Sequence, residues 1–181
     1  DIFKEIVVLD DGSTDDTVKI CENFSQVVDI HSQKNLPFDE TRDKNTLLKM
    51  ALSRNPDFIL TLDGDEVLMP NSKQRLFYEL NVLYANTNLF ELKELYVWDK
   101  PNQYRCDGIF NNTWSKKLFR LKDQPKNLRF GGTDFPGNSH CAAFPNNLIG
   151  KNQPVRSKIK ILHYGYYDEE CGELIQACSK A

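Results

Sequence analysis

The chain has 181 residues, of which 40% are hydrophobic and 27% charged, with a net charge of −3. This composition is typical of one globular domain with a buried core, and its charge gives no electrostatic reason to expect nucleic acid as a partner. No apolar run reaches the roughly 20 residues that a membrane-spanning helix needs. Five cysteines at irregular spacing, without a Cys-x-x-Cys pair, predict reduced thiols and a cytoplasmic location.

The first half of the chain alternates between predicted strands and predicted helices. Short apolar runs at 5–9, 27–30 and 58–62 are typical of buried strands. Apolar residues recur at helical spacing after each run, and the first helix is expected to begin at Ser13, with Asp16 completing a capping box. This order predicts a mainly parallel sheet with helices on both faces.

From Leu89 onward the pattern changes to strands separated by loops. Strands are predicted at 89–98, 116–121 and 158–164, with segments rich in Asn, Gly and Pro between them. Long loops in a compact domain are often functional. Because no linker is visible, we expect one α/β domain over 1–181.

Two acidic turns follow two of the predicted strands. Asp10 and Asp11 end the first strand, and Asp63 and Asp65 follow the third. Ligands bind beyond the carboxyl ends of parallel strands, and such carboxylates suit a divalent cation that takes further oxygens from a diphosphate. We therefore expect both turns to face one pocket. Each turn alone could be structural, and a receiver-like phosphotransfer pocket at Asp10 and Asp11 is an alternative that the Asp-x-Asp spacing fits poorly.

Several segments resemble glycosyltransferase family 2. Segment 5–17 is similar to the signature in which a strand ends in Asp-Asp-Gly-Ser-Thr-Asp, and 60–66 is similar to the family's Asp-x-Asp motif. Segment 42–51 resembles Ala-Arg-Asn-x-x-Leu-x-x-Ala, with Lys44 where arginine is common, and the tripeptide at 118–120 resembles that of lipopolysaccharide-core glucosyltransferases. The resemblance implies a three-layer α/β/α GT-A fold. It also implies metal-dependent, inverting transfer of a sugar from a nucleotide-diphosphate sugar, with UDP-sugars favoured. On this resemblance, 1–88 is the nucleotide-binding half of the domain and 89–181 the acceptor-side half.

The resemblance further implies a set of site residues. The expected nucleotide-sugar contacts are Asp10, Asp11, Arg42, Lys44 and Asp63, with Asp10 or Asp11 accepting a hydrogen bond from the base. The expected ligands of Mn²⁺ or Mg²⁺ are Asp65, Asp63 and His163. The candidates for the general base are Asp134 and His140, which lie in the loop-like region after the metal motif. Relatives often carry His-Glu where this chain has His140-Cys141, so the family's glutamate is absent from that position. Arg42 and Lys44 could equally be solvated charges at a helix start, and His163 an ordinary polar strand end.

The family's domain normally begins with one more strand and helix than this chain contains, so an N-terminally truncated polypeptide is expected. A non-catalytic nucleotide-sugar-binding domain of the same fold is therefore the alternative to the enzyme. The expected partners are a nucleotide-sugar donor and a glycan or glycolipid acceptor in polysaccharide or lipopolysaccharide biosynthesis. The expected location is the cytoplasm, with peripheral association at the inner face of a membrane.

Overall fold

The computed structural model describes residues 3–34, 36–131 and 142–166. The chain divides into two compact units that alternate along the sequence. Unit 1 comprises Asp1–Ile59 and Arg120–Lys151, and unit 2 comprises Leu60–Phe119 and Asn152–Ala181. Every helix within the described ranges is too short or too polar to cross a membrane.

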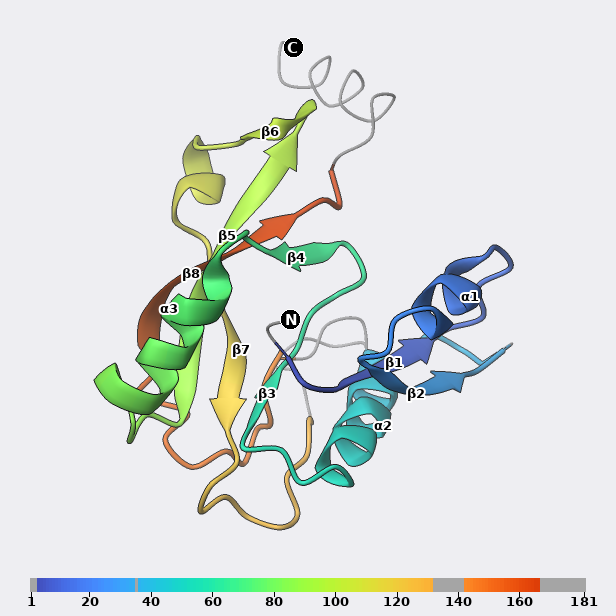
Figure 1. The fold of residues 1–181 in the computed structure, drawn as a ribbon, viewed down its shortest axis with the longest axis horizontal. Helices are drawn as coiled ribbons and strands as arrows, with labels where there is room; N and C mark the ends of the chain where they lie inside the picture. Colours follow the sequence, from blue (N-terminus) through green and yellow to red (C-terminus); the bar gives the residue numbers. More distant parts are fainter. Residues whose placement is uncertain (1–2, 35, 132–141, 167–181) are drawn as a thin grey trace. The chain divides into compact units, whose positions relative to one another are not determined.

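Unit 1 is built on a two-stranded parallel sheet in which a helix follows each strand (Figure 1). Strand β1 (Ile6–Asp10) pairs with β2 (Val27–Ser32), and the helices are α1 (Thr17–Glu22) and α2 (Glu40–Leu52). Helix α2 packs against β1, and α1 packs against β2. The buried apolar side chains come from α2 and from the later segment of the unit, namely Leu48, Leu128, Phe130, Pro145 and Leu148.

The start of α1 differs from the prediction. The helix begins at Thr17 rather than at Ser13, and its N-cap Asp16 makes no side-chain capping bond. Asp15 instead accepts hydrogen bonds from the backbone nitrogen of Thr17 at 3.0 Å and from its hydroxyl at 2.6 Å. Short acidic side chains of this kind satisfy backbone donors locally, which favours a turn over an earlier helix start.

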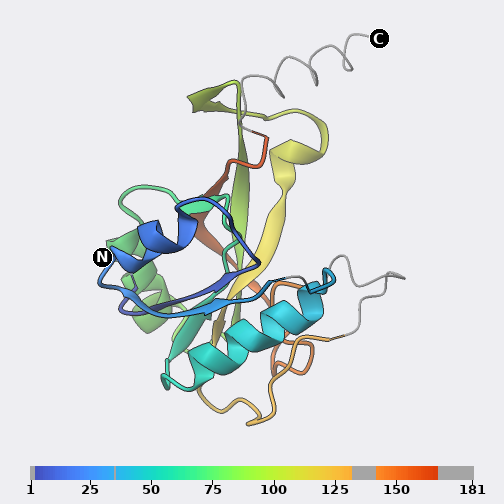
Figure 2. The same ribbon diagram turned by 90° about the vertical axis from the view of Figure 1, so that its right-hand side faces the viewer.

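Unit 2 contains most of a mixed sheet, in which β7, β5, β8 and β4 are neighbours in that order and β6 pairs with β5. Strand β3 spans the boundary of the division, with Phe58 and Ile59 in unit 1 and Leu60 in unit 2. The strands are β3 (Phe58–Leu60), β4 (Glu66–Leu68), β5 (Leu89–Trp98), β6 (Lys100–Tyr104), β7 (Trp114–Arg120) and β8 (Val155–His163). Helix α3 (Ser72–Tyr78) continues into a π-helical turn (Glu79–Leu83) and packs against β8, as Figures 1 and 2 show in green. A 3₁₀ turn (Gly108–Asn112) precedes β7.

The core of unit 2 lies along β5, which has neighbours on both sides. Leu89, Phe90 and Val97 of this strand are at most 1% exposed. On β8 the exposure alternates, with Ser157, Ile159 and Ile161 buried and Arg156, Lys158 and Lys160 exposed, as expected for a strand that has one covered face.

The α/β class predicted from the sequence is confirmed. Fewer of the strand pairs are parallel than we expected for a mainly parallel sheet. Strand β5 is parallel to β8 but antiparallel to β6 and β7, and β4 is antiparallel to β8. The chain connects β5, β6 and β7 in succession without a crossover helix. Only Asp99 separates β5 from β6, and so short a connection can join only antiparallel neighbours.

Candidate functional site

Strand β1 ends in the turn Asp10-Asp11-Gly12. Asp10 is buried, and its Oδ1 accepts a hydrogen bond from the backbone nitrogen of Ser13 at 3.1 Å. Hydrogen bonds from the Ser13 side chain and backbone hold the pKa of Asp10 below its usual value. Gly12 has a φ of +90°, and a Cβ there would lie 3.2 Å from the carbonyl oxygen of Gln33, so the turn requires glycine. Asp10 thus stabilises the turn, while Asp11 is exposed.

Gln33, which the sequence analysis did not single out, links two carboxylates in unit 1. Its side chain is buried, and its Nε2 donates to Asp11 Oδ1 at 2.7 Å and to Asp43 Oδ1 at 2.9 Å. The residue directly follows β2, the parallel neighbour of β1. Its place at the carboxyl end of that strand is the signal that could have identified it.

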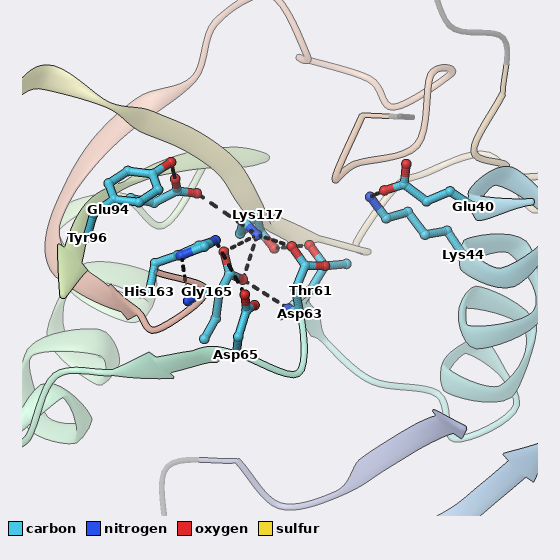
Figure 3. Close-up of polar contacts among 11 residues, drawn as sticks. Glu40, Lys44, Thr61, Asp63, Asp65, Glu94, Tyr96, Lys117, His163 and Gly165 are labelled. Atoms are coloured by element: carbon cyan, nitrogen blue, oxygen red, sulfur yellow. Dashed lines mark hydrogen bonds and ion pairs between the residues drawn. The ribbon is translucent and has the colours of Figure 1, made fainter. Parts of the chain in front are cut away.

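The two predicted cations on α2 are both paired with carboxylates. Arg42 donates from Nε to Asp43 Oδ1 at 2.8 Å, and this bond, with the charge of Asp43, raises the pKa of Arg42. Its buried Nη2 lies 2.8 Å from the same oxygen but makes no hydrogen bond of acceptable geometry to a described residue. Lys44 Nζ lies 2.5 Å from Glu40 Oε1 (Figure 3). Arg42 therefore joins the Asp11–Gln33 cluster through Asp43, and Lys44 pairs along its own helix.

The predicted metal motif forms a tight turn in unit 2. The backbone nitrogen of Glu66 donates to the carbonyl of Asp63 at 3.1 Å, and that of Asp63 donates to Glu66 Oε2 at 2.9 Å. The side chain of Asp63 is 58% exposed and that of Asp65 is 42% exposed, whereas that of Glu66 is 1% exposed. The two motif aspartates are thus open to a ligand, and Glu66 closes the turn from inside.

A buried lysine lies at the centre of the carboxylates in this turn (Figure 3). Lys117 Nζ lies 2.6 Å from Glu66 Oε2, 3.1 Å from Asp63 Oδ2 and 4.0 Å from Glu94 Oε1. Burial alone would lower the pKa of Lys117, but the neighbouring carboxylates outweigh it and raise the pKa. Burial also raises the pKa of Glu66, against the opposing effect of Lys117. Lys117 could not be identified from the sequence, because a lysine within a strand has no local signature.

The late histidine proposed as a metal ligand contacts the motif directly. Strands β4 and β8 pair with Glu66 opposite His163, and the backbone nitrogen of Tyr164 donates to the Asp65 carbonyl at 2.7 Å. This register brings His163 Nε2 to 3.7 Å from Asp65 Oδ2. Gly165 N donates to His163 Nδ1 at 3.2 Å on the opposite side of the ring.

Gly165 leaves the space that this contact needs. A Cβ at position 165 would lie 2.5 Å from Asp65 Oδ2 and 2.6 Å from His163 Cε1. Any larger residue would therefore displace one of the two predicted ligands. Gly64, inside the motif, has no atom within 4 Å of its corresponding Cβ position, so close packing does not explain that glycine.

The residues of this turn fit a divalent cation. Asp65 Oδ2 and His163 Nε2 are 3.7 Å apart, a separation that two ligands each about 2.1 Å from one ion can have. Three carboxylates (Asp63, Glu66 and Glu94) lie within 4.0 Å of one ammonium group, and Asp65 adds a further carboxylate to the turn, so negative charge is in excess. In the described part of the chain, no three His, Cys, Asp or Glu side chains gather as a ready-made metal cage. Substrate oxygens and water would therefore complete the coordination, as is common for Mg²⁺.

Aromatic rings adjoin the histidine. The ring of His163 lies 4.7 Å from that of Tyr96 and 5.9 Å from that of Tyr166, measured between centroids. The Tyr96 hydroxyl donates to Glu94 Oε2 at 2.6 Å, and burial, followed by this bond, raises the pKa of Tyr96. Phe110 adjoins Tyr96, and Trp98 adjoins Tyr166. The guanidinium of Arg105 lies over the rings of both Trp98 and Phe110. These contacts limit the freedom of the His163 ring.

The structure divides the predicted residues into two groups. Asp10, Asp11, Arg42 and Lys44 belong to unit 1, and Asp63, Asp65 and His163 belong to unit 2. The general-base candidates Asp134 and His140 lie outside the described residues.

The family model for glycosyl transferase family 2 matches residues 2–144, which is more than half of the chain. The chain belongs to glycosyl transferase family 2. As a member of this family, it is a glycosyltransferase with an α/β GT-A fold, and it transfers a glycosyl group from a nucleotide-sugar donor to an acceptor. Enzymes of family 2 commonly use divalent metals. No curated protein matches the chain. The family resemblance and the enzyme prediction are thereby confirmed, and the non-catalytic alternative has no further support.

Proposed function

We propose that this family 2 enzyme transfers a sugar from a UDP-sugar to an acceptor hydroxyl in a metal-dependent reaction that inverts the anomeric carbon. The observation that carries the proposal is the contact between Asp65 and His163 in the acidic turn of unit 2. Asp65 directly precedes β4 and His163 ends β8, a strand distant in sequence, and Gly165 leaves room for both side chains. Such an arrangement supports a binding site better than it supports an ordinary polar turn.

Asp65 and His163 would hold Mn²⁺ or Mg²⁺. Asp63 would contribute less directly, because one of its oxygens already accepts a hydrogen bond from Lys117. When bound, the metal supplies electrostatic stabilisation of the charge that develops on the leaving diphosphate. The excess of carboxylates over ammonium groups around the turn supports a cation rather than a bare anion as the first ligand.

The nucleotide would be recognised by the cluster in unit 1. Asp11 is the better candidate for the base contact, because Asp10 is buried and already accepts from Ser13. A carboxylate acceptor suits uracil, whose ring carries an imide N–H. Gln33 holds Asp11 in place, and Arg42, whose buried Nη2 makes no hydrogen bond of acceptable geometry to a described residue, would contribute positive charge near the nucleotide. Lys44 remains a predicted contact.

The reaction would be a single displacement. The acceptor oxygen attacks the anomeric carbon, the bond from that carbon to the diphosphate oxygen breaks, and a general base takes the acceptor proton. Asp134 and His140 remain the predicted bases. We further propose that 1–181 acts as one catalytic domain on a glycan or glycolipid acceptor, as in lipopolysaccharide-core biosynthesis. The proposed location is the cytoplasm, at the inner face of a membrane.

Calorimetric titration of UDP in the presence and absence of Mn²⁺ tests the proposal. Asp65→Ala should abolish the metal-dependent part of UDP binding, because it removes the carboxylate that contacts His163. Asp29→Ala removes an exposed carboxylate from β2 and should behave as the wild type. Equal affinities for the wild type and Asp65→Ala would exclude the assignment. Mn²⁺-stimulated hydrolysis of the UDP-sugar would show directly that the domain activates the donor.

A further inference from the structure

Lys117 occupies an irregular position in the sheet of unit 2. In the pairing of β5 with β7, Phe90 lies opposite Leu118 and Glu91 lies opposite Lys116, so Lys117 is an extra residue without a partner in this ladder. A bulge of this kind redirects one side chain and is frequent near functional sites. The Lys117 carbonyl accepts from Thr61 N at 2.9 Å and from Thr61 Oγ1 at 3.2 Å. The backbone of Lys117 thus holds the segment that leads into the acidic turn.

The ammonium of Lys117 holds the two ends of the same turn. An ammonium group has three protons to donate. Lys117 Nζ lies within hydrogen-bond distance of three oxygens, namely both oxygens of Glu66 at 2.6 Å and Asp63 Oδ2 at 3.1 Å. The side chains of Lys117 and Glu66 are 6% and 1% exposed, whereas that of Asp63 is 58% exposed. The buried Lys117–Glu66 ion pair therefore holds one oxygen of Asp63, whose carboxylate is exposed to solvent.

We infer that Lys117 is a positioning residue for donor binding, which orients Asp63 and fixes the turn that carries Asp65. The inference rests on the proposed function, because it takes the turn to be the place where the metal and the diphosphate bind. Stability alone is a weak reason for the arrangement, since buried ion pairs contribute little more than apolar residues of the same volume. Orientation of an exposed carboxylate is something that an apolar pair could not provide.

The test separates positioning from charge neutralisation. Lys117→Met alone leaves Glu66 buried without a counter-charge, so this variant would be destabilised whatever the role of Lys117. The double variant Lys117→Met/Glu66→Gln removes both charges and keeps an oxygen at position 66 that can accept from Asp63 N. We expect its melting temperature to lie within about 4 °C of the wild type. Its affinity for UDP with Mn²⁺ should nevertheless fall about tenfold or more, because Asp63 has lost its anchor.

Lys160→Met provides the matched control, because it makes the same substitution at an exposed position on β8 of the same sheet. Its UDP affinity should equal that of the wild type. Wild-type UDP affinity in the double variant would overturn the inference, since Lys117 would then serve only to neutralise the buried carboxylates Glu66 and Glu94.

Hydrogen exchange measured by mass spectrometry gives a second readout that does not depend on the ligand. In the double variant, exchange should accelerate over 61–66 while β5 and β8 stay protected. Faster exchange throughout unit 2, or no change at 61–66, would contradict the positioning role. If the wild type itself shows no Mn²⁺-dependent UDP binding, the proposed function fails, and the exchange result alone decides whether Lys117 anchors the turn.

Discussion

Asn45 of α2 holds the backbone of Phe130 by two hydrogen bonds, although 85 positions separate the two residues. Asn45 Oδ1 accepts from Phe130 N at 2.9 Å, and Asn45 Nδ2 donates to the Phe130 carbonyl at 2.9 Å. The same Nδ2 also donates to the Thr41 carbonyl at 2.8 Å. Within unit 1 the Asn45 amide therefore connects α2 to the backbone at Phe130, which lies shortly before the predicted bases Asp134 and His140 in the sequence.

Asn45→Ala should destabilise unit 1 by about 1–3 kcal/mol, because it leaves the Phe130 backbone groups without their partners. Urea unfolding, followed by circular dichroism, measures this difference. Asn81→Ala is the control. Asn81 is helical like Asn45 but is exposed, and its amide donates to the nearby Phe77 carbonyl, four residues earlier in the chain. Equal losses of stability in the two variants would show that the contact between Asn45 and Phe130 has no special importance.

Gly165→Ala should weaken the binding of Mn²⁺ alone by about tenfold, as is typical when the groups that support metal ligands are disturbed. The added Cβ would lie 2.5 Å from Asp65 Oδ2 and would force that carboxylate or the His163 ring to move. Titration followed by electron paramagnetic resonance of free Mn²⁺ measures the affinity. Gly64→Ala introduces the same methyl group where no atom lies within 4 Å and should leave the affinity unchanged. Similar losses in both variants would contradict the steric explanation.

Gln33→Glu should lower UDP affinity about tenfold or more. The substitution replaces an amide that donates to Asp11 and Asp43 with a third carboxylate beside them. Repulsion between like charges at about 4 Å costs about 1–4 kcal/mol at effective dielectric constants between those of water and a protein surface. Calorimetry with UDP checks this, and Gln153→Glu, at an exposed position, serves as the charge-matched control. Wild-type UDP affinity in Gln33→Glu would show that Gln33 does not belong to the UDP-binding site.

The stability of unit 1 should depend on the ionisation of Asp10 at acid pH. Hydrogen bonds from Ser13 lower the pKa of Asp10 in the folded state below the reference value of 3.8. Folded Asp10 therefore binds fewer protons than unfolded Asp10 in the interval between the two pKa values, and stability rises with pH there. The stabilisation is complete above the unfolded pKa and is lost as pH falls through the folded pKa.

Melting temperatures of the wild type and Asp10→Asn from pH 2.5 to 6 test this relationship. The advantage of the wild type should be largest above about pH 4 and should shrink toward zero at lower pH. An advantage that grew on acidification would contradict the sign of the pKa shift.

Local patterns predicted the elements of the fold well where one face of an element is buried. The strand expected at 89–98 coincides with β5, and the helix expected near Lys44 lies within α2. The helix expected from Ser13 begins later, because side chains such as Asp10 and Asp15 accept hydrogen bonds from the backbone nitrogens that a helix start would have to satisfy. Periodicity reports burial, whereas the choice between a turn and a helix start depends on these local hydrogen bonds.

By itself the sequence determined the family and the presence of two acidic turns after strands, because a turn motif and the apolar run before it are contiguous in the chain. The tertiary structure decided which distant side chains accompany them. His163 meets Asp65 through the register of β4 with β8, and Lys117 reaches the turn through an irregularity in the pairing of β5 with β7. A shift of one residue in either ladder would turn these side chains to the opposite face of the sheet, and register depends on pairing between segments that local periodicity does not specify.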